Sequence, residues 1–432
     1  MQNDKVKQDK YIKDFDSWSN ASNISHDYNV EALELHKKFG GKLESKSRFK
    51  LENREDLSKA YTPGVAEVCR EISKRGVKGK ENEEGVLGSA NNFISAALDY
   101  TLKRNTVAII SDGSAILGLG NLGAYASIPV MEGKVCILKE FADVDAFPIC
   151  LDTQDTEEII SIIKNIAPVF GGINLEDISA PKCFEIEERL RAELSIPVMH
   201  DDQWGAATVA LAALINSLKI VNKDKQNIKL VLSGVGAAGV ATARLLISYG
   251  IKNIIFVDSK GIISKKRIEG GEILNKEKLE LLTLTNEHDI DGGLDIAIKN
   301  SDIFIGLSKP NVLRGDMVKS MNADPIIFAL ANPSPEIDVE VARAVGARII
   351  ATGRSDYPNQ INNSLVFPGF WRGVLDAQYA GKYFGIDNNI FIKIAKDLAK
   401  YTENSEGGIN ENRILPDMFD KEVVKIVAGS FK

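Results

Sequence analysis

The six residues Gly234-Val235-Gly236-Ala237-Ala238-Gly239 constrain the fold of this chain more than any other stretch. An apolar run, Ile228–Ser233, precedes them, and apolar residues recur at helical spacing over Ala237–Tyr249. The next apolar run ends in Asp258, about 20 residues further on, as a dinucleotide-binding strand–turn–helix unit requires. A glycine turn in an unrelated α/β domain is the alternative, and the combined register of strand, helix and acid disfavours it.

Each small residue of this loop has an expected role in binding a dinucleotide. Gly234 permits the tight turn, Gly236 lets the backbone approach the pyrophosphate, and Gly239 lets the helix pack on the sheet. Ala237 and Ala238 begin the helix whose N-terminus would hold the pyrophosphate. We therefore expect NAD or NADP as a cofactor.

The choice between NAD and NADP stays open at this point. Asp258 is placed to bind the ribose hydroxyls, which favours NAD. Lys260 follows two residues later and can instead meet the 2′-phosphate of NADP. A solvated lysine in a turn is an equally good interpretation of Lys260.

Apolar runs at regular intervals predict a five-stranded, doubly wound parallel sheet with right-handed crossovers in the second half of the chain. They are residues 228–233, 254–258, 302–306, 326–330 and 348–351. The first half alternates in the same way, with strand candidates at 106–111, 134–138 and 147–151. A helix is expected at 156–167, and a long Ala/Leu-rich helix over 203–221 is expected to connect two α/β domains.

Composition argues against several classes of protein. With 432 residues the chain is too long for one ordinary core, and its 44% hydrophobic and 26% charged residues are typical of globular domains. A net charge of −7 argues against nucleic-acid binding. The four cysteines lack metal-binding spacing, the N-terminus lacks a signal-peptide core, and the longest apolar run, 204–215, is too short to span a membrane. We expect a cytoplasmic protein that acts on small soluble molecules.

Two adjacent acidic pairs are the second chemical signal. Glu176-Asp177 follows a Gly-Gly bend, and Asp201-Asp202 follows the strand-like residues 196–199. Carboxylates that lie together repel one another unless a cation joins them, and an oxygen-only set suits Mg²⁺ or Mn²⁺. Because neighbours in a strand point to opposite faces, we expect three of the four to bind the ion and the fourth to stay beside it. Capping of the following helix is the alternative for Asp201 and Asp202.

Four further polar residues complete the candidate site. Tyr61 lies on a Pro-Gly turn, and Lys134 follows Gly133. If they meet, the ammonium lowers the pKa of the phenol and partial burial lowers that of the lysine, so that the pair can transfer protons. Asn332 and Asn363 lie where ligands of such sheets bind, and their amides can hold a carboxylate. An Asx-turn before proline is a strong alternative for Asn332.

In combination these motifs resemble the malic enzymes of the short bacterial type. The matching stretches run from about Tyr61 to Gly373 and are YTPGVAEVCREI, SDGSAILGLGNLG, IPVMEGK, GGINLEDI, VMHDDQWGAA, SGVGAAGVA, FVDSKG, ALANPSPE and TGRSDYPNQINNSLVFPG. The resemblance implies oxidative decarboxylation of L-malate to pyruvate and CO₂, with NAD or NADP and with Mg²⁺ or Mn²⁺. It also implies a homodimer and an α/β catalytic domain joined to a Rossmann-type, doubly wound dinucleotide-binding domain.

Matching positions imply a role for each candidate residue. Lys134 is similar to the general base of the family, Tyr61 to the acid that protonates the enol, and Asp201 to the acid beside the catalytic lysine. The remaining implied roles are metal binding by Glu176, Asp177 and Asp202, and substrate binding by Asn332 and Asn363.

The chain departs from the family pattern at two positions. Ala115 stands where the larger relatives carry a substrate-binding arginine, as in other short bacterial members, so the second carboxylate of malate needs another partner. Trp204 follows the HDDQ stretch where His or Ile is usual, which should alter packing near the metal more than its ligation.

The resemblance and the patterns together give an expected domain organisation. We expect an N-terminal arm at 1–30, a malic-enzyme N-terminal catalytic domain at 31–202, a dinucleotide-binding domain at 203–365 and a C-terminal helical segment at 366–432.

Three alternatives to this function stay open. The same site can support malolactic or oxaloacetate-decarboxylating activity, which differ from malate oxidation in the net production of reduced cofactor. A non-catalytic dinucleotide-sensing module needs the glycine loop but not the acids. A metal-free dehydrogenase of amino or hydroxy acids leaves the acidic pairs unused.

Overall fold

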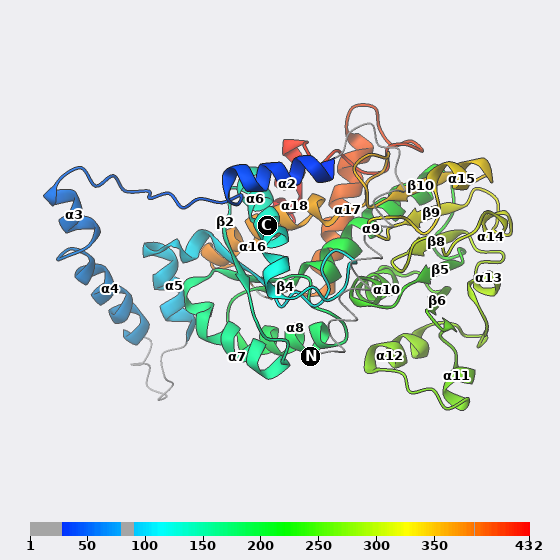
Figure 1. Cartoon of the computed structure of the whole chain (residues 1–432), viewed down its shortest axis with the longest axis horizontal. Helices are drawn as coiled ribbons and strands as arrows, with labels where there is room; N and C mark the ends of the chain where they lie inside the picture. The colour runs from blue at the N-terminus through cyan, green and yellow to red at the C-terminus, as the bar shows by residue number, and fades with distance from the viewer. Residues whose placement is uncertain (1–27, 79–89, 384) are drawn as a thin grey trace. The chain divides into compact units, whose positions relative to one another are not determined.

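A computed structural model describes residues 28–78, 90–383 and 385–432 (Figure 1). The chain divides into two compact units, Met1–Glu44 and Ser45–Lys432. The described part of the first unit contains helix α2 (Tyr28–Phe39). The predicted arm at 1–30 therefore falls almost entirely outside the described residues. All elements named below belong to the second unit.

The first sheet has four parallel strands in the order β2-β1-β3-β4. Their bounds are β1 (Thr106–Ser111), β2 (Asp145–Cys150), β3 (Gly172–Leu175) and β4 (Val198–His200). Strand β1 lies inside the sheet and is buried along its whole length, as its unbroken apolar run requires. The helices between the strands are α6 (Ala124–Ala142), α7 (Thr156–Ile166) and α8 (Lys182–Glu193).

One predicted strand of this half is wrong. Residues 134–138 lie inside helix α6, which continues through Pro129. The buried side chains of this helix include Met131, Lys134, Leu138 and Ala142, a spacing of three to four residues. That spacing is typical of a helix. The strand was predicted because an apolar run of five residues does not distinguish a strand from a buried helix turn.

The second sheet has six strands in the order β10-β9-β8-β5-β6-β7. Their bounds are β5 (Leu230–Ser233), β6 (Ile254–Asp258), β7 (Gly261–Ile262), β8 (Ile303–Gly306), β9 (Ile326–Ala329) and β10 (Ile349–Thr352). The five predicted strands are present and parallel, which confirms the doubly wound α/β fold. The predicted number is wrong by one, because β7 pairs antiparallel with β6 through a turn too short to show a strand pattern. The order reverses between β5 and β8, and ligands of such sheets bind at this point.

Short helices surround the second sheet. They are α10 (Ala237–Tyr249), α11 (Lys265–Glu269), α12 (Lys276–Leu284), α13 (Leu294–Ala297), α14 (Gly315–Lys319) and α15 (Val339–Ala344).

Helix α9 (Asp201–Ile220) begins directly after β4 of the first sheet and packs on α10 beside the second. It is buried along most of its length, which fits the Ala/Leu-rich composition. Three C-terminal helices follow the second sheet: α16 (Phe367–Tyr379), α17 (Asn388–Asn404) and α18 (Lys421–Gly429). Helix α16 contacts α6 and α17 contacts α9, so the end of the chain supports the elements of the first half.

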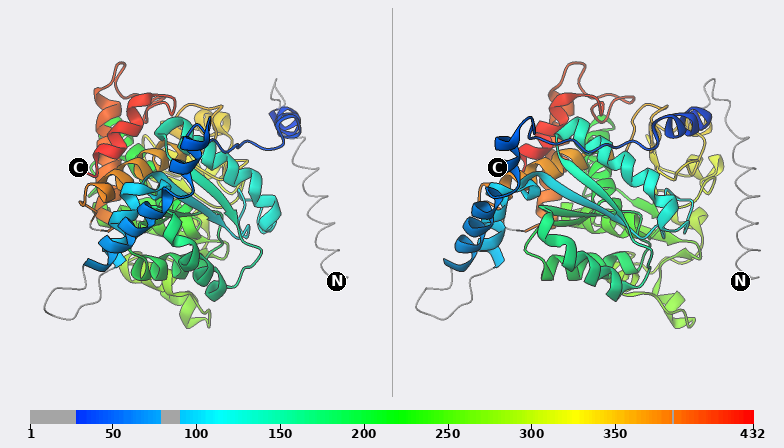
Figure 2. Two further views of the ribbon diagram at one scale, coloured as in Figure 1. Left: turned by 90° about the vertical axis from the view of Figure 1, so that its left-hand side faces the viewer. Right: turned by 60° about the vertical axis from the view of Figure 1, so that its left-hand side comes forward.

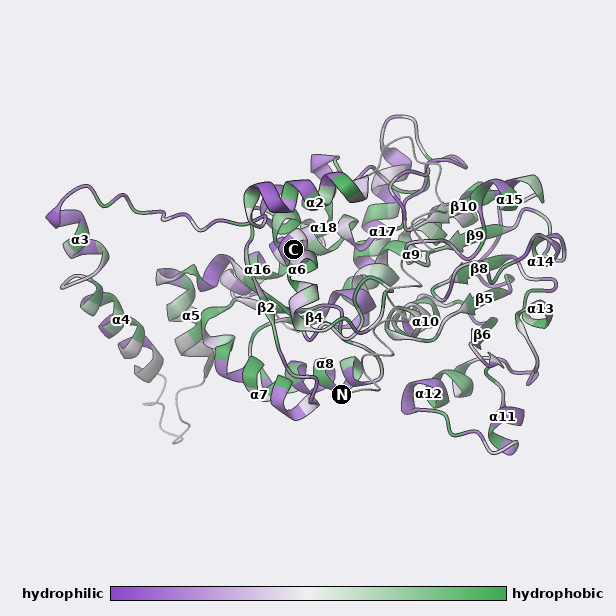
Figure 3. Cartoon of the chain, viewed as in Figure 1, coloured by the Kyte–Doolittle hydropathy of each residue, from purple (hydrophilic) through white to green (hydrophobic). Residues whose placement is uncertain are grey.

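The N-terminal elements of this unit are α3 (Arg54–Ala60), α4 (Val65–Lys78), α5 (Ala90–Tyr100) and the 3₁₀ turn η1 (Leu102–Asn105). Helices α3 and α4 are largely exposed, whereas α5 and η1 are partly buried through Ala96, Leu98 and Lys103. Helix α4 packs on α5, while Figure 1 shows α3 and α4 apart from α6 and α9; Figure 2 gives two further views of the same segment, in blue. Figure 3 shows apolar and polar residues alternating around α4. Exposed apolar side chains of this segment are Phe49, Leu51, Leu57, Tyr61 and Val65.

The hydrophobic core forms two clusters of buried residues, the larger of which extends over both sheets and α9. Within the described ranges, no helix combines the length and the apolar character that crossing a membrane would need.

Candidate active site

The two acidic pairs lie side by side because β3 and β4 are neighbouring parallel strands. Leu175 pairs with His200 in the sheet, so the residues that follow them, Glu176 and Asp201, leave the same edge. The Glu176 carboxylate interacts electrostatically with the other three, and Asp202 interacts with both Asp177 and Asp201. The structure therefore brings together the two acidic pairs that the sequence predicted to form one site.

Lys134 reaches the acidic pairs from α6. Its side chain is only 7% exposed, and its ammonium forms ion pairs with Glu176 Oε1 and with Asp201 Oδ2. The ring of Phe367 covers it, with the ring centroid 4.4 Å from Nζ. Lys134 is thus a buried cation between two carboxylates.

The second acid of each pair is held by backbone groups. The Asp177 N–H donates to Asp202 Oδ2 at 2.7 Å, and the Leu117 N–H donates to Asp177 Oδ1 at 3.3 Å. Asp177 has a positive φ of 53°, which an aspartate tolerates better than most residues. The N–H of Ala115, at the position without the family arginine, donates to the Asp177 carbonyl at 2.9 Å.

The burial and the charges of this cluster shift the pKa of Lys134, Glu176, Asp177 and Asp201. Burial alone would lower the pKa of Lys134, but Asp201 and Glu176 raise it above its ordinary value, so the expectation of a lowered lysine pKa is wrong here. Burial raises the pKa of Glu176 and of Asp201, against the opposing charge of Lys134. Burial and then the charge of Asp202 raise the pKa of Asp177 to about 7. One ammonium therefore does not compensate this set of carboxylates.

The donor set fits a hard divalent cation. Among the described residues, Asp177 Oδ2 and Asp201 Oδ1 are buried atoms without a hydrogen-bond partner, and an acceptor in that state is costly unless a cation or donor meets it. No three His, Cys, Asp or Glu side chains in the described ranges are already arranged around one point as metal ligands. The Lys134 ammonium instead bridges Glu176 and Asp201.

Gly205 leaves room for Asp201. A Cβ at Gly205 would lie 2.1 Å from Asp201 Oδ1 and 2.9 Å from Asn363 Cβ, so no larger residue fits. The same contact places Asn363, from the 3₁₀ turn η3 (Asn363–Leu365), beside the acidic cluster.

Asn332 lies at the end of the second sheet that faces this cluster. A Cβ at Gly118 would lie 2.7 Å from the Asn332 carbonyl oxygen, so the loop after β9 lies against the loop after β1. Leu117 of that loop donates to Asp177. Both predicted asparagines therefore lie next to the loops that carry the acids.

Tyr61 does not lie with these residues. Its side chain is 69% exposed at the C-terminal end of α3, and Figure 1 shows α3 apart from α6, which carries Lys134. The predicted pairing of Tyr61 with Lys134 within one chain is therefore absent from the described structure.

Two supporting residues, Asn174 and Glu187, were not predicted from the sequence. Asn174 donates from Nδ2 to Glu176 Oε2 at 3.0 Å and accepts from the Trp371 indole N–H at 2.9 Å. The face of Trp371 fills the space beside Gly172, where a Cβ would lie 2.2 Å from the ring. Asn174 sits two residues before the predicted acid, but no pattern linked it to a tryptophan nearly 200 residues away.

The second missed residue is Glu187 of α8. Its buried carboxylate accepts hydrogen bonds from the His200 backbone N–H at 2.8 Å and from Gln203 Nε2 at 3.0 Å. It also accepts from the Trp204 indole N–H at 3.0 Å and pairs with Arg191 at 2.7 Å. The unusual Trp204 was the one signal of this contact, because a buried indole N–H needs an acceptor.

The glycine loop has the geometry expected of a pyrophosphate site. Gly234 has a φ of 104°, and a Cβ there would lie 2.2 Å from the Leu307 carbonyl oxygen. A Cβ at Gly239 would lie 1.9 Å from the Gly234 carbonyl oxygen, so the helix packs closely on the turn. Gly236 is the N-cap of α10, and its missing Cβ would meet nothing within 4 Å, which leaves its outer side open.

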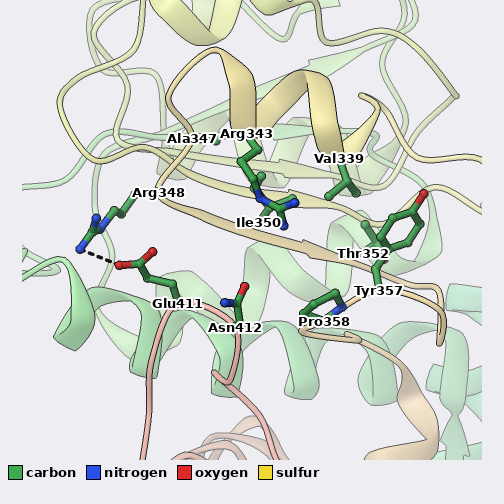
Figure 4. Close-up of a pocket in the computed structure, with 10 residues that line it drawn as sticks. All are labelled: Val339, Arg343, Ala347, Arg348, Ile350, Thr352, Tyr357, Pro358, Glu411 and Asn412. Atoms are coloured by element: carbon green, nitrogen blue, oxygen red, sulfur yellow. Dashed lines mark ion pairs between the residues drawn. The ribbon is translucent and has the colours of Figure 1, made fainter.

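A pocket of about 550 Å³ lies elsewhere, at the outer edge of the second sheet (Figure 4). It lies between α15, the end of β10 and the segment that carries Glu411 and Asn412. Its Arg348 pairs with Glu411 at 2.6 Å, and its Arg343 pairs with Glu340 at 2.7 Å. None of the predicted site residues lines it.

Comparison with known proteins gives consistent matches along the chain. Residues 40–191 match the family model "Malic enzyme, N-terminal domain", and residues 204–429 match "Malic enzyme, NAD binding domain". The NAD-dependent malic enzyme of Geobacillus stearothermophilus is 51% identical over 388 residues, which cover 90% of this chain and 75% of that protein. The bifunctional malic/malolactic enzyme of Bacillus subtilis is 47% identical over 92% of this chain and 90% of its own length.

A solved structure agrees with these matches. The crystal structure of the NAD-dependent malic enzyme of Thermotoga maritima superposes with a TM-score of 0.83 at 44% identity. The superposition covers 93% of this chain and 98% of that one.

Proposed function

Since this chain belongs to the malic enzyme family, of the short bacterial type, we propose that it oxidatively decarboxylates L-malate to pyruvate and CO₂. The reaction would reduce NAD or NADP and require Mg²⁺ or Mn²⁺. The observation that carries the proposal is the buried Lys134 ammonium between Glu176 and Asp201, beside further unpartnered carboxylate oxygens. The cytoplasm is the proposed location, since Cys69, Cys150 and Cys183 are free thiols, as in a reducing compartment.

Glu176, Asp177 and Asp202 would hold the divalent ion. When bound, such an ion supplies Lewis-acid polarisation of the substrate oxygen and stabilises the charge left by decarboxylation. Asn174 would support metal binding by Glu176, because the hydrogen bond that it donates to Glu176 Oε2 orients the carboxylate. The hydrogen bond from the Asp177 N–H orients Asp202 in the same way.

Lys134 is the proposed base for the malate hydroxyl proton. Its two carboxylate partners keep it protonated in the described structure, since they raise its pKa. With Glu176 engaged as a metal ligand, Lys134 would keep only Asp201 as a partner, and its pKa would fall toward the range in which an amine accepts a proton. Asp201 would then receive a hydrogen bond from the newly formed ammonium.

Asn332 and Asn363 are proposed to hold the substrate carboxylates. Asn363 lies beside Asp201 and Gly205, and Asn332 lies against the Gly118 loop, so both border the acidic cluster. Their amides would provide part of the binding that an arginine at the Ala115 position gives in the larger relatives.

Tyr61 is proposed to act in the site of a second copy of this chain. Its phenol is exposed on α3, together with Leu57 and Phe49, so one copy presents both the acid and an apolar surface to a partner. In a symmetric homodimer, each copy would supply Tyr61 to the site of the other.

A mixing experiment tests this arrangement. The variants Lys134→Ala and Tyr61→Phe should each be nearly inactive alone, since each lacks one proton-transfer group. Mixed under conditions that exchange subunits, they should form heterodimers with one intact site and regain up to about half of the wild-type rate in those dimers. Full activity of Tyr61→Phe alone, or mixtures that stay inactive although heterodimers form, would contradict the role in a partner site.

The overall activity is tested by following the absorbance of the reduced cofactor with L-malate, NAD or NADP, and Mn²⁺. We expect turnover that EDTA abolishes and added Mn²⁺ restores. Asp202→Asn and Glu176→Gln should lower kcat by about 10³-fold or more, because a metal ion contributes several kcal/mol to transition-state stabilisation. Unchanged turnover of these variants in EDTA would refute the metal-assisted mechanism.

A second candidate activity is favoured by one relative. The Bacillus subtilis protein carries the name bifunctional malic/malolactic enzyme at 47% identity. If this chain shares that chemistry, lactate will accumulate from malate without net reduced cofactor. Product analysis therefore distinguishes pyruvate with reduced cofactor from lactate without it.

A further inference from the structure

Glu336 is a buried carboxylate that joins two loops at one end of the second sheet. It lies four residues after Asn332, and its side chain is 0% exposed. Oε1 accepts a hydrogen bond from the Ser308 N–H at 2.8 Å, and Oε2 accepts one from the Ala331 N–H at 3.0 Å. The first donor belongs to the loop after β8 and the second to the loop after β9.

Only an ionised carboxylate holds both loops well. When both oxygens accept from N–H groups, the ionised form is favoured, whereas a glutamine would turn its NH₂ group toward one of the two donors. Burial raises the pKa of Glu336, and the hydrogen bonds from the Ser308 and Ala331 N–H groups oppose that rise. A neutral side chain of the same shape would therefore release one loop.

Gly306, the last residue of β8, leaves room for this carboxylate. A Cβ at Gly306 would lie 2.4 Å from the carboxyl carbon of Glu336 and 2.6 Å from its Oε1. Directly after β9, the Leu330 N–H donates to the Gly306 carbonyl at 3.0 Å. Glu336 thus lies across the carboxyl ends of two neighbouring parallel strands, the edge at which such sheets bind their ligands.

The loop after β8 borders the glycine loop. Ser308 Oγ lies 3.2 Å from Ser233 Oγ, a hydrogen-bond distance, and Ser233 directly precedes Gly234. A Cβ at Gly234 would lie 2.2 Å from the Leu307 carbonyl oxygen and 3.1 Å from Ser308 Cβ. A shift of the Ser308 backbone would therefore reach the turn that has the geometry of a pyrophosphate site.

The loop after β9 carries Asn332, the proposed substrate ligand. Ala331, whose N–H donates to Glu336, directly precedes it. The Ala331 side chain is buried, whereas Asn332 is exposed. The contact with Glu336 thus fixes the backbone directly beside a side chain that is open to a ligand.

We propose that Glu336 is a positioning residue for hydride transfer, which holds the cofactor loop and the substrate loop in a fixed relation to each other. The inference rests on the proposed function, because it concerns the same cofactor and substrate sites. Hydride transfer requires close alignment of the two reactants, and a misplacement of about 1 Å can cost about 100-fold in rate. Since Glu336 is fully buried, it acts through the two loops and not on the substrate itself.

Stopped-flow single turnovers test this role. With enzyme in excess over NAD, and with saturating malate and Mn²⁺, the observed rate constant for formation of NADH does not depend on how much of the protein is folded. Glu336→Gln should lower this constant by about ten- to hundredfold, the range for a lost hydrogen bond to a charged group. Malate deuterated at the hydroxyl-bearing carbon should slow the variant further, because hydride transfer then limits the rate. An unchanged constant, or a lower constant without an isotope effect, would overturn the inference.

Glu340→Gln is the matched control. It makes the same substitution four residues further along, in α15, but the Glu340 side chain is 71% exposed and pairs with Arg343 rather than with a loop of the site. Its rate constant should equal that of the wild type. An equal loss of rate in Glu340→Gln and Glu336→Gln would show that the loop contacts of Glu336 are not the cause.

Cofactor binding without malate separates this inference from the proposed function. In Glu336→Ala both N–H groups lose their acceptor, so fluorescence titration with NADH should give a Kd about tenfold higher than in the wild type. A loss of folded protein would change the endpoint of the titration but not this Kd. A wild type that binds NADH but does not oxidise malate would refute the proposed function, and the Kd ratio would still decide the inference. Malate oxidation by the wild type, with an unchanged Glu336→Gln rate constant, would refute the inference alone.

Discussion

At the scale of single residues, the site is defined by an excess of buried carboxylates over cations. The Lys134 ammonium forms ion pairs with both Glu176 and Asp201, while Asp177 Oδ2 has no hydrogen-bond partner among the described residues. A buried carboxylate in this situation keeps its proton to a higher pH than in water. In the metal-free protein, Asp177 should therefore make folding less favourable at neutral pH than in mild acid.

This expectation can be tested at Asp177. Its pKa rises from 3.8 to about 7 on folding, so between these values the folded chain holds a proton that the unfolded chain has lost. Stability must then fall as pH rises through this window, with a slope of at most about 1.4 kcal/mol per pH unit from this group. Urea unfolding in EDTA should show this fall in the wild type relative to Asp177→Asn. A difference between the two proteins that is flat or rises from pH 4 to 7 would contradict the assignment.

The sequence predicted most of these residues because carboxylates, a lysine and glycines form local patterns. Glu176, Asp177, Asp201, Asp202 and Lys134 do lie together. The arrangement of Tyr61 could not be predicted, because a Pro-Gly turn fixes the local backbone but not the surface that the turn faces. Asn174 and Glu187 were missed because their partners are distant in sequence or lie in separate elements.

At the scale of elements, the junction of β4 and α9 depends on α8. Glu187 of α8 accepts from the His200 backbone and from the side chains of Gln203 and Trp204, which flank the two site aspartates. Trp204 also stacks on Phe391 of α17, with ring centroids 4.9 Å apart and planes 6° from parallel. The C-terminal helices thus support the start of α9 through this tryptophan.

Removal of Glu187 should weaken the junction. Glu187→Ala leaves the buried indole N–H, the Gln203 amide and the His200 N–H without their acceptor, which should cost about 2–4 kcal/mol of unfolding free energy. Glu188→Ala is the control, because Glu188 is the neighbouring glutamate and is 71% exposed. Urea denaturation followed by tryptophan fluorescence measures both. Equal stability of the two variants would show that the Glu187 contacts do not hold the junction.

The elements themselves were largely predictable, and the failures have physical reasons. Strands β1 and β6 and helix α10 match their predicted bounds, since each is a clear apolar run or helical pattern. The prediction of a strand at residues 134–138 was wrong because a buried helix turn and a buried strand can have the same composition over five residues. Strand β7 was not predicted because a strand of two residues shows no periodicity in the sequence.

At the scale of the whole molecule, α9 links the edge of the first sheet that carries the acidic pairs to the second sheet. The acids lie at its N-terminus, and its body packs on α10, whose N-terminus carries the glycine loop. Substrate oxidation requires the hydroxyl-bearing carbon and the nicotinamide to be adjacent, and this helix pair connects the two binding regions. The proposed domain boundaries at 202/203 and 365/366 place α9 at the start of the cofactor-binding domain.

The central claim is that Glu176, Asp177 and Asp202 bind one divalent ion beside Lys134. Crystals grown with Mn²⁺ and examined by anomalous diffraction test it most directly. The account predicts one strong anomalous peak within coordination distance of all three carboxylates, with Glu176 released from the Lys134 ammonium. No peak at this position, with Lys134 still paired to Glu176 at saturating Mn²⁺, would contradict it.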